Sequence, residues 1–133
     1  MKIASLVARY LLGVIFLVFG LNGFLHFIPM PPPSGTAGQF MGALFVSHYM
    51  VVVFLLQVIP AILLLVNRYV PLALTLLAPI IVNIVMFHTL MAPEGLPLAI
   101  VVTVLWILTA LGVRSAFAPL LQQQAPGEGA ARL

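Results

Sequence analysis

The sequence predicts an all-α fold, a bundle of four transmembrane helices. Of its 133 residues, 64% are apolar and only 5% are charged, and the mean hydropathy is +1.29. Soluble domains carry about a quarter charged residues, so this chain lacks the polar residues that would cover a water-soluble core. Four apolar runs approach the roughly twenty residues that cross about 30 Å of hydrocarbon. A lipid bilayer is therefore the predicted surrounding of the chain.

The first predicted span covers residues 3–27. Its basic start resembles a signal peptide, but the apolar stretch has no small-x-small cleavage motif, so we interpret it as a membrane helix. The loop that follows, residues 29–35, holds four prolines and a glycine and must lie outside the hydrocarbon. Residues 39–47 are then predicted to form a short interfacial helix in this first outer loop.

Three further spans follow, which we place at residues 49–66, 70–91 and 96 to about 117. The connections at 67–69 and 92–95 are so short that the helices they join must be antiparallel. Beyond residue 121 the sequence becomes polar and contains glycine. We therefore divide the chain into a four-span membrane domain, residues 1–121, and a flexible cytoplasmic tail, residues 122–133.

The basic residues predict the orientation. In this four-span arrangement all five fall on one side of the membrane, namely Lys2, Arg9, Arg68, Arg114 and Arg132. The opposite side carries Glu94. Because Lys and Arg are retained on the cytoplasmic side, both termini are predicted to be cytoplasmic, in a multi-pass protein of the bacterial inner membrane.

Composition also narrows the classes of function. The chain has no cysteine, so thiol exchange, iron–sulfur clusters and thiolate metal sites lack their ligand. The pI near 10 rests on scattered basic residues and not on a patch, so no nucleic acid is expected as a partner. No pair of acids, nucleophile with a base, or phosphate loop is recognisable. These features favour a non-catalytic protein over an enzyme.

A few strongly polar residues nevertheless lie in or beside the predicted spans. Each costs on the order of 1 to 3 kcal/mol near a helix centre and needs a partner or a purpose. The candidates for cofactor binding are Asn22, His26, Gln57, Asn83 and His88. Asn22 and His26 are spaced i and i+4, so they would share a helix face and could together hold a quinone carbonyl, a lipid headgroup or a neighbouring helix.

The histidines also suggest a metal site. His26, His48 and His88 all fall toward the outer side, and every methionine after the first lies in the same layer. Imidazole and thioether groups together suit copper, and an axial histidine would equally suit a tetrapyrrole. The alternative, which we favour, is that the methionines fill apolar gaps and the histidines bond to headgroups or carbonyl groups.

Two further patterns concern packing. Gly13 and Gly20 share a helix face opposite Asn22, which suggests that the first span packs on two sides in an oligomer or larger complex. The alternative is that these glycines face lipid. Trp106 lies near the middle of the last span and its indole N–H needs an acceptor, for which we considered Gln57 or a neighbouring carbonyl freed by a proline.

Four strings carry a resemblance to a known family, residues 11–27, 67–74, 78–88 and 92–97. Through them the chain resembles the DoxX-like (DoxX/DoxD) family of small membrane proteins over nearly its whole length, to about residue 121. The resemblance implies a four-helix bundle of a subunit type associated with a thiosulfate:quinone oxidoreductase. Many relatives carry glutamates where Gln57 stands and near Trp106. An amide and an indole cannot carry protons as a carboxylate does, so this departure argues against a proton-coupled role.

The leading hypothesis is therefore a non-catalytic accessory subunit of a membrane redox or electron-transfer complex, packed against other membrane subunits or copies of itself. The alternative is an oxidoreductase component that binds a quinone or a metal directly through Asn22, His26 and His88. A second alternative is a small-solute transporter, but residues 3–20 and 98–108 offer almost no polar pathway.

Overall fold

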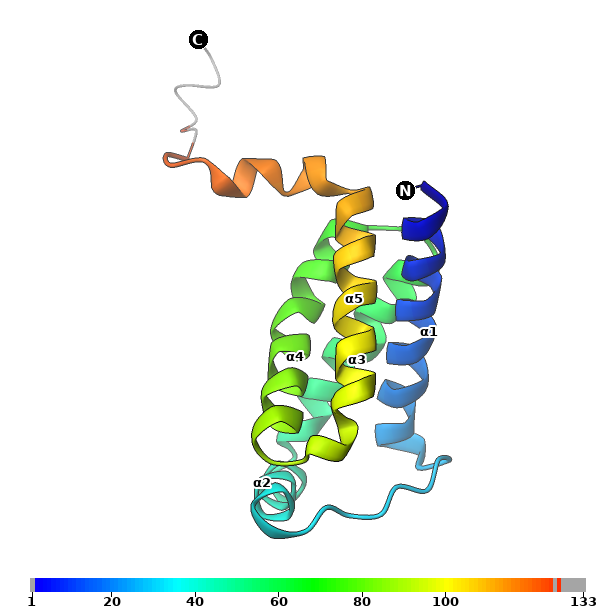
Figure 1. Ribbon diagram of the computed structural model, residues 1–133, viewed down its shortest axis with the longest axis vertical. Coiled ribbons are helices and arrows are strands. Elements are labelled where there is room, and N and C mark those ends of the chain that lie inside the picture. Colours follow the sequence, from blue (N-terminus) through cyan, green and yellow to red (C-terminus); the bar gives the residue numbers. More distant parts are fainter. Residues whose placement is uncertain (1, 126, 128–133) are drawn as a thin grey trace.

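The computed structural model describes residues 2–125 and 127, and this part of the chain is all-α (Figure 1). Its five α-helices are α1 (Lys2–Leu25), α2 (Gly35–Val46), α3 (Tyr49–Leu65), α4 (Val70–Leu90) and α5 (Leu96–Gly112). Short 3₁₀ segments flank α5, namely η1 (Pro93–Gly95), η2 (Arg114–Ala116) and η3 (Ala118–Leu121).

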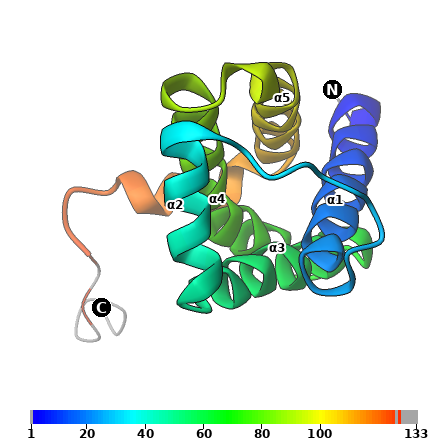
Figure 2. The same cartoon turned by 90° about the horizontal axis from the view of Figure 1, so that it is seen from below.

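Four of the helices form the bundle, and the fifth, α2, crosses one end of it (Figures 1 and 2). Contacts join α1 to α3 and α5, and α4 to the same two helices, so the order round the bundle is α1, α3, α4, α5. Each helix is antiparallel to both neighbours. We call the end crossed by α2 the α2 end, and the opposite end, where α1 begins and α5 finishes, the Lys2 end. Fully buried leucines fill the centre, namely Leu12, Leu64, Leu74 and Leu77.

The lengths and compositions of the helices suit a bilayer. Three segments are long and apolar enough to cross it, α1, α4 and the continuous stretch Pro93–Gly112. The shorter α3 follows α2 after a bend of 87°, and if this bent pair is one span there are four. Large apolar side chains cover the outside of the bundle; Val82 and Ile100, for example, are 56% and 59% exposed. The chain is therefore a small multi-pass membrane protein.

Three glycines bring α1 close to α3. An ideal Cβ atom at Gly20 would lie 2.8 Å from Cγ2 of Val58, and one at Gly23 would lie 2.4 Å from the ring of Phe54. Gly13 meets α3 in the same way, about two helical turns nearer the Lys2 end than Gly20. Small residues permit such close approach of two helix backbones. The glycine face of the first span therefore packs against α3 of the same chain and does not face lipid, while packing of α1 in an oligomer or larger complex stays a prediction.

The predicted boundaries hold at most helix starts but not at the last helix end. The interfacial helix expected at residues 39–47 corresponds to α2 and begins earlier, directly after the proline-rich loop. The last span, expected to reach about Phe117, ends at Gly112, and η2 and η3 turn across the Lys2 end (Figure 1). Gly112 stands at this end and the charged Arg114 follows it, and glycine is a poor helix former at the end of an apolar run. The predicted tail, residues 122–133, falls mostly outside the described residues, as does Arg132.

Candidate functional site

Asn22 is buried and bonds to its own chain. The main-chain N–H of Ile28 donates to Oδ1 of Asn22 at 2.7 Å, and Nδ2 of Asn22 donates to the carbonyl of Ile28 at 3.3 Å. The amide thereby fastens the loop after α1 to the helix. His26 lies beyond the last residue of α1, in the left-handed conformation with φ 53°. Asn22 and His26 therefore do not share a helix face, because α1 ends before the proline-rich loop and the expected spacing is broken.

Two of the three histidines meet at one cavity. His26 and His48, both exposed, line a hollow of about 120 Å³ at the α2 end. Its remaining walls come from α1, α2 and α3, namely Gly23, Phe24, Phe45, Met50, Val51 and Phe54. The aromatic rings pack on one another, with the Phe24 and Phe54 centroids 5.8 Å apart. This cavity combines imidazole groups with an aromatic wall.

His88 lies apart from this cavity, in the last turn of α4. Its Nδ1 is 3.0 Å from the carbonyl oxygen of Ala92, and its ring lies so close to Gly95 that a Cβ atom there would be 2.1 Å from Cε1. The ring thus fixes the turn between α4 and α5. Within residues 2–125 and 127, no three histidine or acidic side chains lie close enough together to hold a metal ion. A metal site made of His26, His48 and His88 stays a prediction. Within the described part of one chain, these three side chains do not come together.

The other predicted polar residues do not converge either. Asn83 is exposed on α4 and donates through Nδ2 to the carbonyl of Pro79 in its own helix, at 2.8 Å. Gln57 is 9% exposed and packs beside Gly20. The indole of Trp106 donates to a carbonyl on α4, at Leu74, and not to the α3 acceptors considered from the sequence. Trp106 faces α4 because α3 and α5 are diagonal to each other in the bundle.

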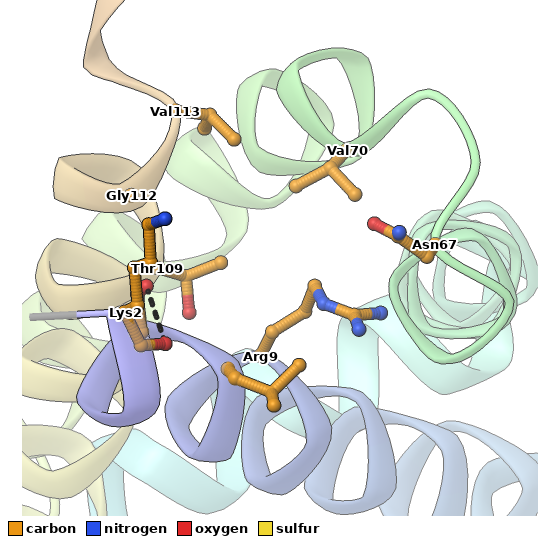
Figure 3. A pocket seen from close by; sticks show the side chains of 9 residues that line it. Lys2, Arg9, Asn67, Val70, Thr109, Gly112 and Val113 are labelled. Carbon is orange, nitrogen blue, oxygen red and sulfur yellow. Dashed lines mark hydrogen bonds between the residues drawn. The ribbon is translucent and has the colours of Figure 1, made fainter.

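A polar cavity at the Lys2 end was not predicted from the sequence. It has a volume of about 190 Å³ and lies between α1, the α3–α4 turn and the end of α5 (Figure 3). Its lining residues are Lys2, Ser5, Leu6, Arg9, Asn67, Val70, Thr109, Gly112 and Val113. We counted Arg9 only toward orientation. Its position inside an apolar span was the signal, since an ionisable residue within a membrane helix marks a functional site by default.

The geometry around Arg9 follows from the end of α3. The N–H groups of Arg68 and Asn67 donate to the carbonyls of Leu63 and Leu64, at 3.0 and 3.4 Å, and Asn67 has φ 56°. This is a Schellman motif, in which asparagine is one of the few residues that adopt the left-handed position. Nη1 of Arg9, which is 8% exposed, donates to the carbonyl of Leu64. The guanidinium thus complements the partial negative charge of the helix end.

Two places in the described chain therefore combine polar groups with a cavity. One is the hollow between His26 and His48 at the α2 end, and the other surrounds Arg9 at the Lys2 end. Comparison of the chain with protein-family models, with curated proteins and with solved structures gave no match. Function is therefore inferred from the residues and their contacts.

Proposed function

We propose that this chain is a non-catalytic accessory subunit of a membrane redox complex, of the DoxX-like kind. The observation that carries the proposal is that polar side chains of the bundle bond within the chain instead of facing a common ligand. The bonded pairs are Asn22 with Ile28, Asn83 with Pro79, His88 with Ala92 and Trp106 with Leu74. Side chains used in this way stabilise a scaffold, and a scaffold is what an accessory subunit supplies.

The resemblance to DoxX-like proteins supports the same function. Two of the strings that carry it begin in the tight turns of the bundle, residues 67–69 between α3 and α4, and residues 92–95 between α4 and α5. Each turn has a specific backbone requirement. Asn67 and Tyr69 have positive φ, and Gly95 leaves room for the ring of His88. These strings thus encode the shape of the bundle, which supports a shared architecture and a subunit role more than a shared chemistry.

Native mass spectrometry of the tagged protein, drawn from its own membranes in mild detergent, tests this proposal. An accessory subunit should elute with larger redox subunits at a fixed stoichiometry. The control is the same purification of an unrelated tagged four-helix membrane protein at matched expression, which should bring down none of these subunits. Elution of the chain alone, or with the same proteins as the control, would overturn the proposal.

The cavity between His26 and His48 favours a second candidate, an oxidoreductase component that binds a quinone. Imidazole N–H groups can donate to a quinone carbonyl, and the phenylalanine rings offer a stacking surface. Its volume of about 120 Å³ is below the roughly 300 Å³ of ordinary ligand pockets, so it would admit a headgroup ring and leave the tail in lipid.

Quinone extraction from the purified protein tests this candidate. The variants His26→Ala and His48→Ala should each lower the amount of bound quinone severalfold. His88→Ala is the matched control, because it removes the same side chain outside the cavity. Equal quinone content in all three variants and the unaltered protein would exclude a quinone site at this position.

A further inference from the structure

Arg9 holds a positive charge inside the bundle that the described chain does not neutralise. A guanidinium is always charged and offers five N–H donors. One nitrogen bonds to the carbonyl of Leu64, and Cζ lies 4.4 Å from the centroid of the Tyr10 ring. A main-chain carbonyl and an aromatic face each supply only partial negative charge. The carboxylate present in the described residues, Glu94, belongs to η1 at the α2 end. Because buried charges are normally paired, this arrangement calls for an anion from outside the described chain.

The cavity beside Arg9 is built to receive such an anion. In Figure 3 the guanidinium extends from α1 toward Asn67 on the α3–α4 turn, with Thr109 on the opposite wall. Lys2 lines the same cavity and is exposed. Arg9, Lys2 and the amide of Asn67 can all donate hydrogen bonds. At about 190 Å³ the space would hold several water molecules, at about 30 Å³ each, or one phosphate-sized group.

The depth of the site matches the headgroup layer of a bilayer. Arg9 follows Lys2 by two helical turns, about 10 Å. The polar layer on each side of the hydrocarbon is roughly 5 to 8 Å thick, and an arginine side chain reaches toward it from below. The Lys2 end also carries Arg68 in the α3–α4 turn and Arg114 just after α5. Together these charges produce a positive potential that attracts anions to this end.

We infer that the cavity at the Lys2 end is a binding site for a phosphate group, in which Arg9 and Lys2 supply the charge and Asn67 a further donor. The phosphate belongs either to an anionic lipid headgroup or to a soluble phosphate compound, since both present the same oxygens. Arginine suits this role because its planar fork matches two phosphate oxygens, while one nitrogen still bonds to Leu64.

The test is native mass spectrometry of the full-length, delipidated protein, titrated separately with phosphatidylglycerol, phosphatidylcholine and inorganic phosphate. We expect saturable binding of one phosphatidylglycerol, with weaker binding of the zwitterionic lipid. Arg9→Gln should weaken the binding by about tenfold or more, and Lys2→Gln by about fivefold. Arg68→Gln is the matched control, because it removes one positive charge at the same end but lies outside the cavity. Its effect should stay well below the tenfold loss in Arg9→Gln, because Arg68 acts on the ligand only through the general positive potential of this end.

A competition experiment with inorganic phosphate identifies the source of the phosphate group. Release of the lipid by millimolar inorganic phosphate supports a site for soluble phosphate compounds, and retention supports a lipid site. Because Arg9→Gln also removes a contact to α3, Asn67→Gly provides an independent test. Glycine keeps the left-handed backbone and removes the donor. Three results would each overturn the inference. The first is unchanged binding in both Lys2→Gln and Asn67→Gly, and the second is an equal loss of binding in Arg9→Gln and Arg68→Gln. The third is equal retention of phosphatidylglycerol and phosphatidylcholine.

Discussion

The indole N–H of Trp106 on α5 donates a hydrogen bond of 2.9 Å to the main-chain carbonyl of Leu74 on α4. Leu74 is fully buried and Trp106 is half-buried. The acceptor lies about one turn before Pro79, where the proline removes a donor from the ladder of α4. This bond thus joins two helices close to the point where one of them has lost a hydrogen bond of its own.

Replacing Trp106 by phenylalanine tests the contribution of this bond. Trp106→Phe keeps an aromatic ring and removes the donor, so the free energy of unfolding in detergent should fall by about 0.6 to 1.7 kcal/mol. The control is Thr103→Val, whose hydroxyl bonds to Ala99 in the same helix and should matter little. Equal losses in the two variants, measured by unfolding in a mixed-micelle titration, would contradict a role in joining α4 to α5.

The contact between Gly20 and α3 predicts a steric penalty. In Gly20→Ala the new methyl group would meet Val58 and the Cβ atom of Gln57, at 2.8 and 3.2 Å. We expect a loss of about 1 to 3 kcal/mol in the free energy of unfolding, because overpacking forces the helices apart. Gly42→Ala serves as the control, since a Cβ atom there meets nothing within 4 Å. A stabilised Gly20→Ala variant would show that α1 does not approach α3 this closely.

The two hydrogen bonds between Asn22 and Ile28 predict a structural role for this asparagine. Asn22→Ala should cost about 1 kcal/mol or more, because the half-buried N–H of Ile28 loses its acceptor. The loop at residues 26–34 should then become easier to cleave in limited proteolysis. Asn83→Ala, at an exposed position on α4, should change stability by less than about 0.5 kcal/mol. A stable Asn22→Ala variant that loses a bound cofactor would instead favour a ligand role.

The orientation predicted from the basic residues is testable because the chain has no cysteine. We expect Ser34→Cys, in the first loop at the α2 end, to react with a membrane-impermeant maleimide in intact spheroplasts. Ser115→Cys, at the Lys2 end, should react only after the membrane is permeabilised. The reverse pattern would place Arg9 and its cavity on the outer side, against the usual retention of basic residues in the cytoplasm.

The helix starts were predictable from the sequence, and the packing of helix faces was not. Helices α3, α4 and α5 begin at the residues expected, since short turns and prolines at the first helical turn leave few alternatives. The faces that pack together leave a weaker signal. In lipid both the packed and the outward faces of a helix are apolar, so the small residues Gly13 and Gly20 indicated close packing but did not identify α3 as the partner.

For the polar residues, too, the sequence predicted local features and not contacts between residues far apart in the chain. The spacing of Asn22 and His26 predicted a shared face, but α1 ends at Leu25 and His26 itself is in the left-handed conformation. Arg9 was visible in the sequence, yet its acceptor, the carbonyl of Leu64, is far along the chain. Only the antiparallel pairing of α1 with α3 brings the two together. Contacts between distant helices of this kind depend on the tertiary arrangement and not on any local pattern.

The contact between the first and last helices of the bundle has a consequence for biogenesis. Helix α1 reaches its final neighbour α5 at the point where Ser5 meets Gly112. During synthesis at about 5 to 20 residues per second, α1 must wait on the order of ten seconds for that partner to emerge from the ribosome. Throughout this interval the Arg9 cavity lacks its α5 wall. Chaperones or insertases that shelter unfinished membrane proteins would therefore find α1 open on one side until the chain is nearly complete.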